Sequence, residues 1–247
     1  MSNSQLAPGP AAIVVALPWE ATPIAKHLGL RRDGVHAEVI EYRGQEDRVL
    51  LLQTGMGPRG AARALVRLDK PALILSAGFC GGVGPGLDLG DVVVASHVMR
   101  NTDSFPAEPL VLEAATRALK TIGLPFHVGP ILTVDEVVTP AEGLEGRADL
   151  QILAVDMESA YLAEAARRQS VPFLGIRVVS DTPAEPWAAE ARSFLDQDGR
   201  LKAVSLAATL FRHPSWIPRM LRLASQLRLA TRQLAQGTKA LLEELNT

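Results

Sequence analysis

The chain has 247 residues, of which 47% are hydrophobic and 4% aromatic, and its formal net charge is −2. This length suits one α/β domain whose core rests on aliphatic side chains. The charge balance and the scarcity of aromatic residues exclude a basic, base-stacking nucleic-acid binder. The single cysteine, Cys80, excludes an intrachain disulfide.

The first residues are not expected to form a secretory signal. Residues 1–10 are polar and predict a flexible N-terminal tail. The apolar run at residues 11–17 follows no basic segment, and no run reaches the roughly 20 residues that span a bilayer. We therefore expect a cytoplasmic protein.

Short apolar runs alternate with helical patterns between residues 11 and 212. Most of the runs are continuous, as in strands buried on both faces; they cover residues 13–17, 49–52, 73–75, 92–95, 131–134, 152–155 and 173–179. The helical patterns cover residues 18–28, 59–68, 108–122, 157–168 and 187–210. This order predicts one α/β domain over residues 11–212, with helices on the faces of a mostly parallel sheet.

Residues 213–247 form a tail of different character. Apolar residues recur at helical spacing in it, and basic residues lie between them, namely Arg219, Arg222, Arg228, Arg232 and Lys239. The pattern predicts a basic amphipathic helix. Such a helix can dock on the domain or on a second subunit, or it can contact a membrane surface, and both interpretations stay open.

Two glycine clusters each follow an apolar run. Gly55, Gly57 and Gly60 match the G-x-G-x-x-G dinucleotide motif, but the next run ends at residues 75–78 without the acidic residue that would hold a ribose. A nicotinamide or flavin enzyme is therefore disfavoured. The second cluster spans residues 77–84 and can bring backbone N–H groups close to a ligand.

Four carboxylates lie near the ends of predicted strands: Glu20, Asp156, Glu158 and Asp181. A single carboxylate at a helix start is commonly a cap or a partner of the helix dipole. Several of them at one sheet edge, beside two glycine turns, favour a ligand site. The histidines have no ligand spacing, so we expect no metal.

The sequence resembles a known superfamily along residues 11–182. The phrases VVALPWEA, TGMGPRGAA, SAGFCGGVGPGLDLGDVVVAS, VDMESAYLAEAA and VPFLGIRVVSDT look like those of the purine nucleoside phosphorylases and methylthioadenosine/adenosylhomocysteine nucleosidases. The Gly-Met-Gly-Pro phrase and the basic tail look most like the hopanoid-associated phosphorylase branch. The resemblance implies a three-layer α/β fold with a mixed, partly barrel-like central sheet flanked by helices. It also implies a homodimer or higher homo-oligomer.

The resemblance also implies residue roles in cleaving the N-glycosidic bond of a purine nucleoside. Asp181 would be the general acid at purine N7, Glu158 would bind the ribose hydroxyls, and Glu20 would activate water. The substrate-binding set would be completed by Met157, Gly78, Phe79, Cys80, Val137 and Val138. To hold a proton near neutral pH, Asp181 needs a pKa raised by desolvation.

Water and phosphate both remain candidate nucleophiles. Ser76 stands where hexameric phosphorylases keep a phosphate-binding arginine, and Glu20 replaces a glycine of theirs, so both departures favour water. Gly57 and Arg59 are candidates for holding phosphate or another anion, and Arg43 could come from a neighbouring subunit. We expect no cofactor other than inorganic phosphate as a co-substrate, if phosphorolysis applies.

An aspartate at position 181 implies adenine as the base. The sequence leaves the 5′ substituent open between a small methylthio group and a polycyclic lipid such as that of adenosylhopane. In the second case the basic tail would bring the enzyme to a membrane-borne substrate. A methylthioadenosine/adenosylhomocysteine nucleosidase is the alternative activity, and a non-catalytic nucleoside-binding protein is the alternative class.

Overall fold

A computed structural model describes residues 9–44, 46–136, 150–183 and 217–245. Its strands are β1 (Ala11–Val15), β2 (Arg31–His36), β3 (Val39–Arg43), β4 (Val49–Gln53), β5 (Leu73–Gly82), β6 (Val92–Arg100), β7 (Asp103–Pro106), β8 (Phe126–Thr133), β9 (Ala154–Asp156) and β10 (Phe173–Asp181). Its helices are α1 (Pro18–Leu28), α2 (Gly57–Arg67), α3 (Pro109–Thr121), α5 (Ser159–Gln169) and α8 (Ile217–Leu245).

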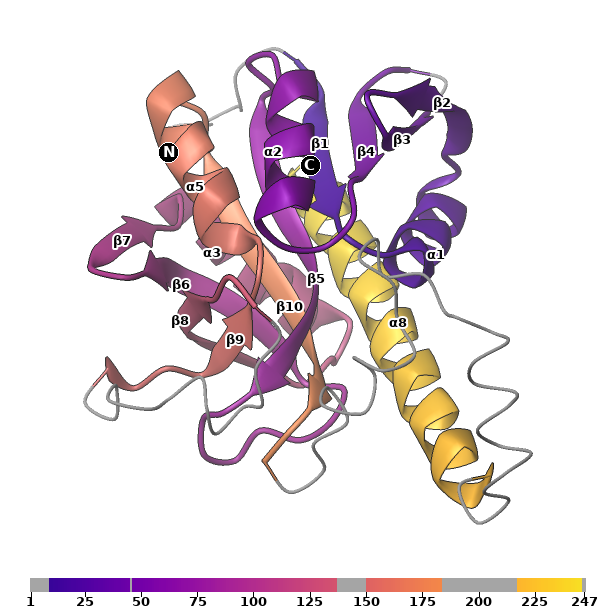
Figure 1. Cartoon of the computed structure of the whole chain (residues 1–247), viewed down its shortest axis with the longest axis vertical. Helices are drawn as coiled ribbons and strands as arrows, with labels where there is room; N and C mark the ends of the chain where they lie inside the picture. Colours follow the sequence, from indigo (N-terminus) through magenta and orange to yellow (C-terminus); the bar gives the residue numbers. More distant parts are fainter. Residues whose placement is uncertain (1–8, 45, 137–149, 184–216, 246–247) are drawn as a thin grey trace.

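All of these strands join one mixed ten-stranded sheet. Strand β5 pairs in parallel with both β1 and β10, and β10 pairs with β6 in antiparallel fashion. Strand β6 continues through β8 and β9 back to β5, so five strands close into a barrel-like ring. Strands β1, β4, β3 and β2 extend from the ring as an open sheet, and β7 pairs with β6 (Figure 1). The mixed, partly barrel-like sheet predicted from the sequence is confirmed.

Both faces of the central strands are buried, which explains their continuous apolar runs. Ile13 and Val15 of β1 face the core cluster that contains α1, α3 and α8, whereas Ala12 and Val14 face the cluster that contains α2 and α5. Successive side chains of a strand point to opposite faces, so one apolar run serves two cores. The result is a layer of helices on each side of the sheet (Figure 1).

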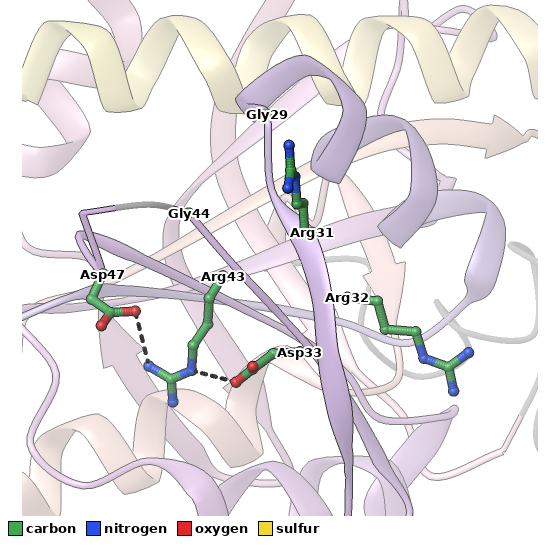
Figure 2. Close-up of a pocket in the computed structure, with 7 residues that line it drawn as sticks. All are labelled: Gly29, Arg31, Arg32, Asp33, Arg43, Gly44 and Asp47. Atoms are coloured by element: carbon green, nitrogen blue, oxygen red, sulfur yellow. Dashed lines mark ion pairs between the residues drawn. The ribbon is translucent and has the colours of Figure 1, made fainter.

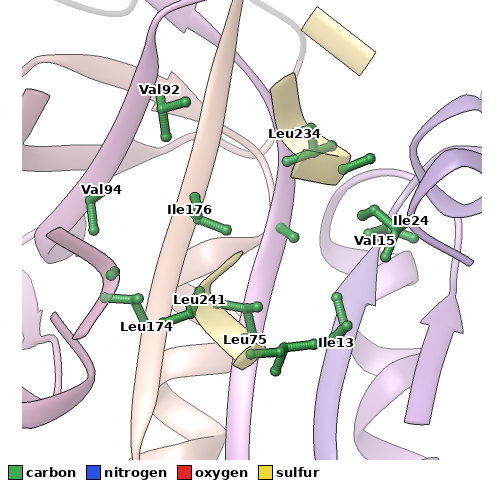
Figure 3. Close-up of a cluster of buried hydrophobic side chains, with 14 of the residues drawn as sticks. Ile13, Val15, Ile24, Leu75, Val92, Val94, Leu174, Ile176, Leu234 and Leu241 are labelled. Carbon is green, nitrogen blue, oxygen red and sulfur yellow. The ribbon is translucent and has the colours of Figure 1, made fainter. Parts of the chain in front are cut away.

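Helix α8 has two different halves. Leu234 and Leu241 are 1% and 0% exposed and lie among Leu75, Ile176 and other strand residues (Figure 3). Burial of each such leucine stabilises the fold by about 1.5–3 kcal/mol. The first half carries Leu221, which is 67% exposed, and extends beyond the sheet (Figure 1). The predicted helix is confirmed, and its second half is part of the domain core.

Some elements of the fold have no clear signal in the sequence, and some predicted ones lie outside the described residues. The hairpin of β2 and β3 was not predicted because β2 is an edge strand whose side chains are mostly exposed, so it lacks an apolar run. Strand β7 is short and was also missed. The helix predicted at 187–210 lies outside the described residues, as do Val137 and Val138. Among the helices in the described ranges, none has an apolar stretch long enough to cross a membrane.

Candidate active site

Strand pairing brings the predicted carboxylates to one edge of the sheet. Gly81 of β5 pairs with Asp181 of β10 on one side and with Val155 of β9 on the other. Glu158 follows β9 directly, and Glu20 accepts a hydrogen bond from the backbone of β5. Glu20, Glu158 and Asp181, separated by up to 161 positions in the chain, are thus gathered around the end of one strand.

Glu20 is held almost completely by backbone donors. Helix α1 begins at Pro18, and the Glu20 side chain turns back so that its Oε2 accepts the N–H groups of Ala16 (3.0 Å) and Leu17 (2.8 Å). Its Oε1 accepts the N–H of Phe79 (2.9 Å). Burial raises the pKa of Glu20, and these N–H groups and the charge of Arg177 offset part of the rise. One lone pair of Oε1 stays available to a ligand or a water molecule.

Gly78 leaves the space in which two charged groups approach each other. A β-carbon at this position would lie 2.8 Å from Glu20 Oε1 and 2.4 Å from Arg177 Nη1. Both distances are shorter than van der Waals contact, so a side chain here would push against both groups. The glycine is therefore required by the close approach of Glu20 and Arg177.

Glu158 lies at the start of α5 and faces the start of α2. Its Oε1 accepts the N–H of Gly57 (2.6 Å), and its Oε2 is 3.9 Å from Arg177 Nη2. Burial, together with the charges of Asp156 and Glu20, raises the pKa of Glu158 to about 7, against the opposing effect of Arg177 and the Gly57 N–H. Proton uptake by this carboxylate is therefore expected close to neutral pH.

Arg177 is the functional residue that the sequence analysis overlooked. It is 2% exposed and donates from Nε to Asp156 Oδ2 (2.8 Å) and from Nη2 to the hydroxyls of Ser76 (2.8 Å) and Ser159 (2.9 Å). A charged residue inside the apolar run 173–179 was the available signal, because a buried guanidinium needs an anionic partner. Ser76 stands at the position where hexameric phosphorylases keep an arginine. Here its hydroxyl accepts a hydrogen bond from Arg177, which lies on another strand, β10.

Asp181 ends β10 and is 4% exposed. Burial raises the pKa of Asp181 to about 6, although Ser180 Oγ donates to its Oδ1 (3.0 Å) and lowers the pKa in part. The acid can therefore stay protonated closer to neutral pH than an exposed aspartate, as a proton donor at this position requires.

The other predicted residues have mixed positions. Met157 is half-buried, and its Cε would be 3.3 Å from a β-carbon at Gly57, so it lies over the start of α2. Phe79 packs against the core, and burial raises the pKa of Cys80 well above its usual value. The Gly57 N–H is already bonded to Glu158, and Arg59 is exposed with no partner in the described ranges. An anion-binding role for these two residues stays a prediction.

Arg43 lies in a separate place. It forms ion pairs with Asp33 (3.2 Å) and Asp47 (3.7 Å) at a cavity of about 530 Å³ on the β2–β3 side (Figure 2). Arg31 and Arg32 also line that cavity, and their side chains point in different directions (Figure 2). Within the described ranges, no group of three or more His, Cys, Asp or Glu side chains is arranged to hold a metal ion.

Comparisons with known proteins find related sequences and folds. Residues 10–213 match the model of the phosphorylase superfamily. A 5′-methylthioadenosine/S-adenosylhomocysteine nucleosidase of Haemophilus ducreyi is 31% identical over 156 residues, which cover 54% of this chain and 67% of the relative. The enzyme of the same name from Halalkalibacterium halodurans is 27% identical over 210 residues, covering 75% of this chain and 89% of the relative.

Solved structures agree in fold. The Neisseria meningitidis nucleosidase in complex with methylthio-immucillin-A has a TM-score of 0.70 at 22% identity and covers 94% of this chain and 98% of its own. The futalosine hydrolase of Helicobacter pylori has a TM-score of 0.73 at 15% identity, with coverage of 96% and 98%. The phosphorylase-like fold inferred from the sequence is confirmed.

Proposed function

Because the chain belongs to the phosphorylase superfamily, we propose that it is an enzyme that hydrolyses the N-glycosidic bond of an adenine nucleoside. The aligned relatives are nucleosidases, which supports adenine nucleoside cleavage. The observation that carries the proposal is the gathering of three buried carboxylates, Glu20, Glu158 and Asp181, at the end of β5.

The chemistry divides between these carboxylates. Asp181 donates its proton to purine N7 while the C1′–N9 bond breaks and its electron pair moves into the ring. Glu158, ionised, accepts hydrogen bonds from the ribose hydroxyls and stabilises the positive charge that develops on the sugar. Water attacks C1′ and gives its proton to Glu20. The products are adenine and the free sugar, and solvent returns Asp181 and Glu20 to their starting protonation states.

The charge balance of the site supports water over phosphate. Arg177 is its buried cation, and Asp156 already neutralises it at 2.7 Å. The N–H of Gly57, which could serve a phosphate, is bonded to Glu158. A phosphate dianion would enter among carboxylates with no uncompensated cation among the buried residues described, which is electrostatically unfavourable. Hydrolysis is therefore the nucleophilic step we propose, and phosphorolysis is the alternative.

The test is a chromatographic assay of adenine release from methylthioadenosine in phosphate-free buffer and in buffer with phosphate. We expect equal rates and a free sugar in both, and Glu20→Gln should lose most activity in both. Strict dependence on phosphate, with a sugar 1-phosphate as product, would exclude hydrolysis. Tight nucleoside binding in calorimetry with no adenine release would instead identify a non-catalytic binding protein.

We further propose that the first half of α8 contacts an anionic membrane surface. Leu221 is 67% and Leu229 45% exposed, and Arg222, Arg228 and Arg232 are exposed on the same side of the helix. No acidic residue precedes Glu243 in this helix. Each arginine near an anionic surface contributes about 1 kcal/mol and each inserted leucine about 1.5–3 kcal/mol. Together they suit reversible contact rather than permanent anchoring.

Membrane contact would suit a nucleoside whose 5′ substituent is a polycyclic lipid, such as adenosylhopane. We propose this hopanoid-related substrate as an extension of the adenine nucleosidase function, with a cytoplasmic homo-oligomer as the working form. Methylthioadenosine is the competing substrate. Relative kcat/KM values for methylthioadenosine and for a lipid-substituted adenosine separate the two, and light scattering gives the oligomer order.

The membrane contact is tested by co-sedimentation of the full chain with vesicles. Because the second half of α8 is in the core, point variants are needed rather than a truncation. The variant with Arg222, Arg228 and Arg232 all changed to Glu should lose binding to anionic vesicles and keep its activity on methylthioadenosine. Lys120→Glu, on the separate helix α3, is a control with a single changed charge. Equal sedimentation of wild type and triple variant would reject the contact.

A further inference from the structure

Asp156 is buried, and groups of the protein hold both oxygens of its carboxylate. It is 4% exposed; Oδ1 accepts from Thr133 Oγ1 (2.6 Å) and the Ser159 N–H (3.4 Å), and Oδ2 accepts from Arg177 Nε (2.8 Å) and lies 2.7 Å from Arg177 Nη2 in an ion pair. An ionised carboxylate has about four acceptor sites. Three of these sites accept hydrogen bonds from the protein, and the charge is paired with Arg177, so Asp156 is engaged inside the protein although it lies two residues before Glu158.

The start of α5 is capped in an unusual way. Glu158 is the N-cap residue of α5, but its side chain makes no capping hydrogen bond. The first N–H groups of the helix are satisfied from elsewhere: Ser159 donates to Asp156 Oδ1 and Ala160 donates to Thr133 Oγ1 (2.9 Å). Helix N-termini need such acceptors. Asp156 and Thr133 thus cap the helix in place of Glu158. The Glu158 carboxylate is therefore free to face Gly57 and, in the proposed function, the sugar.

Asp156 also places the guanidinium of Arg177. Nε donates to Asp156, which leaves Nη2 to donate to Ser76 and Ser159 at a distance of 3.9 Å from Glu158 Oε2. The groups that face Glu158 are therefore Arg177 from β10, Asp156 from β9, Glu20 from α1 and the Gly57 N–H from α2. The guanidinium of Arg177 interacts with both Asp156 and Glu158. If Asp156 lost its charge, the positive charge of Arg177 would act more strongly on Glu158 and Glu20.

We propose that Asp156 is a positioning residue with two roles. Together with Thr133 it caps α5, so the Glu158 side chain is not needed as the cap. It also anchors Arg177 near Glu158, so that Glu158 can bind the sugar in its ionised form. The role of Glu158 at the sugar rests on the proposed nucleosidase function. The arrangement of Asp156, Thr133 and Arg177 does not. A displacement of about 1 Å in a catalytic group can lower the rate about 100-fold.

The experiment compares wild type with Asp156→Asn, Thr133→Val and Thr133→Ser in kcat/KM for methylthioadenosine between pH 5 and 9, with Tm in parallel. Asp156→Asn should lower kcat/KM about 100-fold. It should also move the acidic limb of the profile to lower pH, because Arg177 then stabilises the ionised form of Glu158 more strongly. Thr133→Val should lower kcat/KM with the limb in place, and Thr133→Ser should restore it.

The opposite results are equally clear. A kcat/KM for Asp156→Asn equal to that of wild type overturns the proposal. A lower kcat/KM with the acidic limb of the pH profile unmoved also overturns it, because that result indicates a purely structural role. If Asp156→Asn does not fold, equal kcat/KM in Thr133→Val and Thr133→Ser rejects the capping. If wild type releases no adenine, the nucleosidase function fails by itself. Calorimetry then compares adenosine with 2′,3′-dideoxyadenosine, and Asp156→Asn should lose the preference for adenosine; a retained preference rejects the positioning role.

Discussion

Gly78→Ala tests the architecture of the site most directly. The added methyl group would lie 2.4 Å from Arg177 Nη1 and 2.8 Å from Glu20 Oε1, about 1 Å and 0.6 Å inside ordinary contact at roughly 3.4 Å. Neither group can move away freely, because Arg177 is held by Asp156 and Glu20 by backbone N–H groups. The substitution must therefore displace at least one of them.

The expected magnitude follows from that displacement. Overpacking of this kind destabilises a core by about 1–3 kcal/mol, which lowers Tm by roughly 2–12 °C for a domain of this size. Displacement of Glu20 by about 1 Å should lower kcat/KM about 100-fold, more than the loss of stability alone explains at 25 °C. The assays are adenine release under saturating and limiting substrate and a calorimetric melting curve.

Gly44→Ala is the matched control. A β-carbon there meets only the end of the Leu30 side chain, at 3.3 Å, and the position lies at the cavity of Figure 2 rather than beside Glu20. We expect near-wild-type activity and Tm from it. If Gly78→Ala behaved like Gly44→Ala in both measurements, the close approach of Glu20 and Arg177 at this glycine would be wrong.

Three further predictions concern the acid, the pH response and the long helix. Asp181→Asn should lower kcat by orders of magnitude while the protein still folds, because the amide cannot donate an acidic proton; an unchanged kcat would remove Asp181 from the mechanism. Glu158 has a pKa of about 7 in the folded state, above its unfolded value, so its contribution to stability is complete below about pH 4.5 and is lost as the pH rises through 7. Glu158→Gln should accordingly raise the free energy of unfolding at pH 8 by an amount on the order of 3 kcal/mol, and therefore raise Tm relative to wild type. The same variant should abolish activity. A lower Tm at pH 8 contradicts this sign. Leu241→Ala should destabilise the fold by about 2–5 kcal/mol, whereas Leu221→Ala should change it by less than about 0.5 kcal/mol, as urea titrations can show; equal effects would contradict the different burial of the two halves of α8.

Much of the fold could be predicted because its signals are local. The continuous apolar runs of β1, β5 and β10 indicate burial on both faces, and this burial is what the two core clusters show. The hairpin of β2 and β3 has no such signal. Strand β2 is the edge of the sheet and pairs only with β3, so its position depends on a neighbouring strand and not on an apolar face.

The candidate site divides in the same way. Glu20, Glu158 and Asp181 could be found because each lies at or shortly after the end of a strand, and strand ends gather at one edge. The partners of Arg177 could not be found, since Asp156, Ser76 and Ser159 lie between 18 and 101 positions away from it. Their approach depends on which strands pair, and local spacing does not encode that pairing.

The sequence by itself determined the layered α/β fold, the carboxylates at the edge of the sheet and the basic helix at the end of the chain. These features follow from backbone periodicity and from the chemistry of individual side chains. Only the tertiary structure decided the raised pKa values of Glu158 and Asp181, the cap shared by Asp156 and Thr133, and the burial of half of α8. The reason is that desolvation and charge pairing depend on groups that folding brings together from distant parts of the chain.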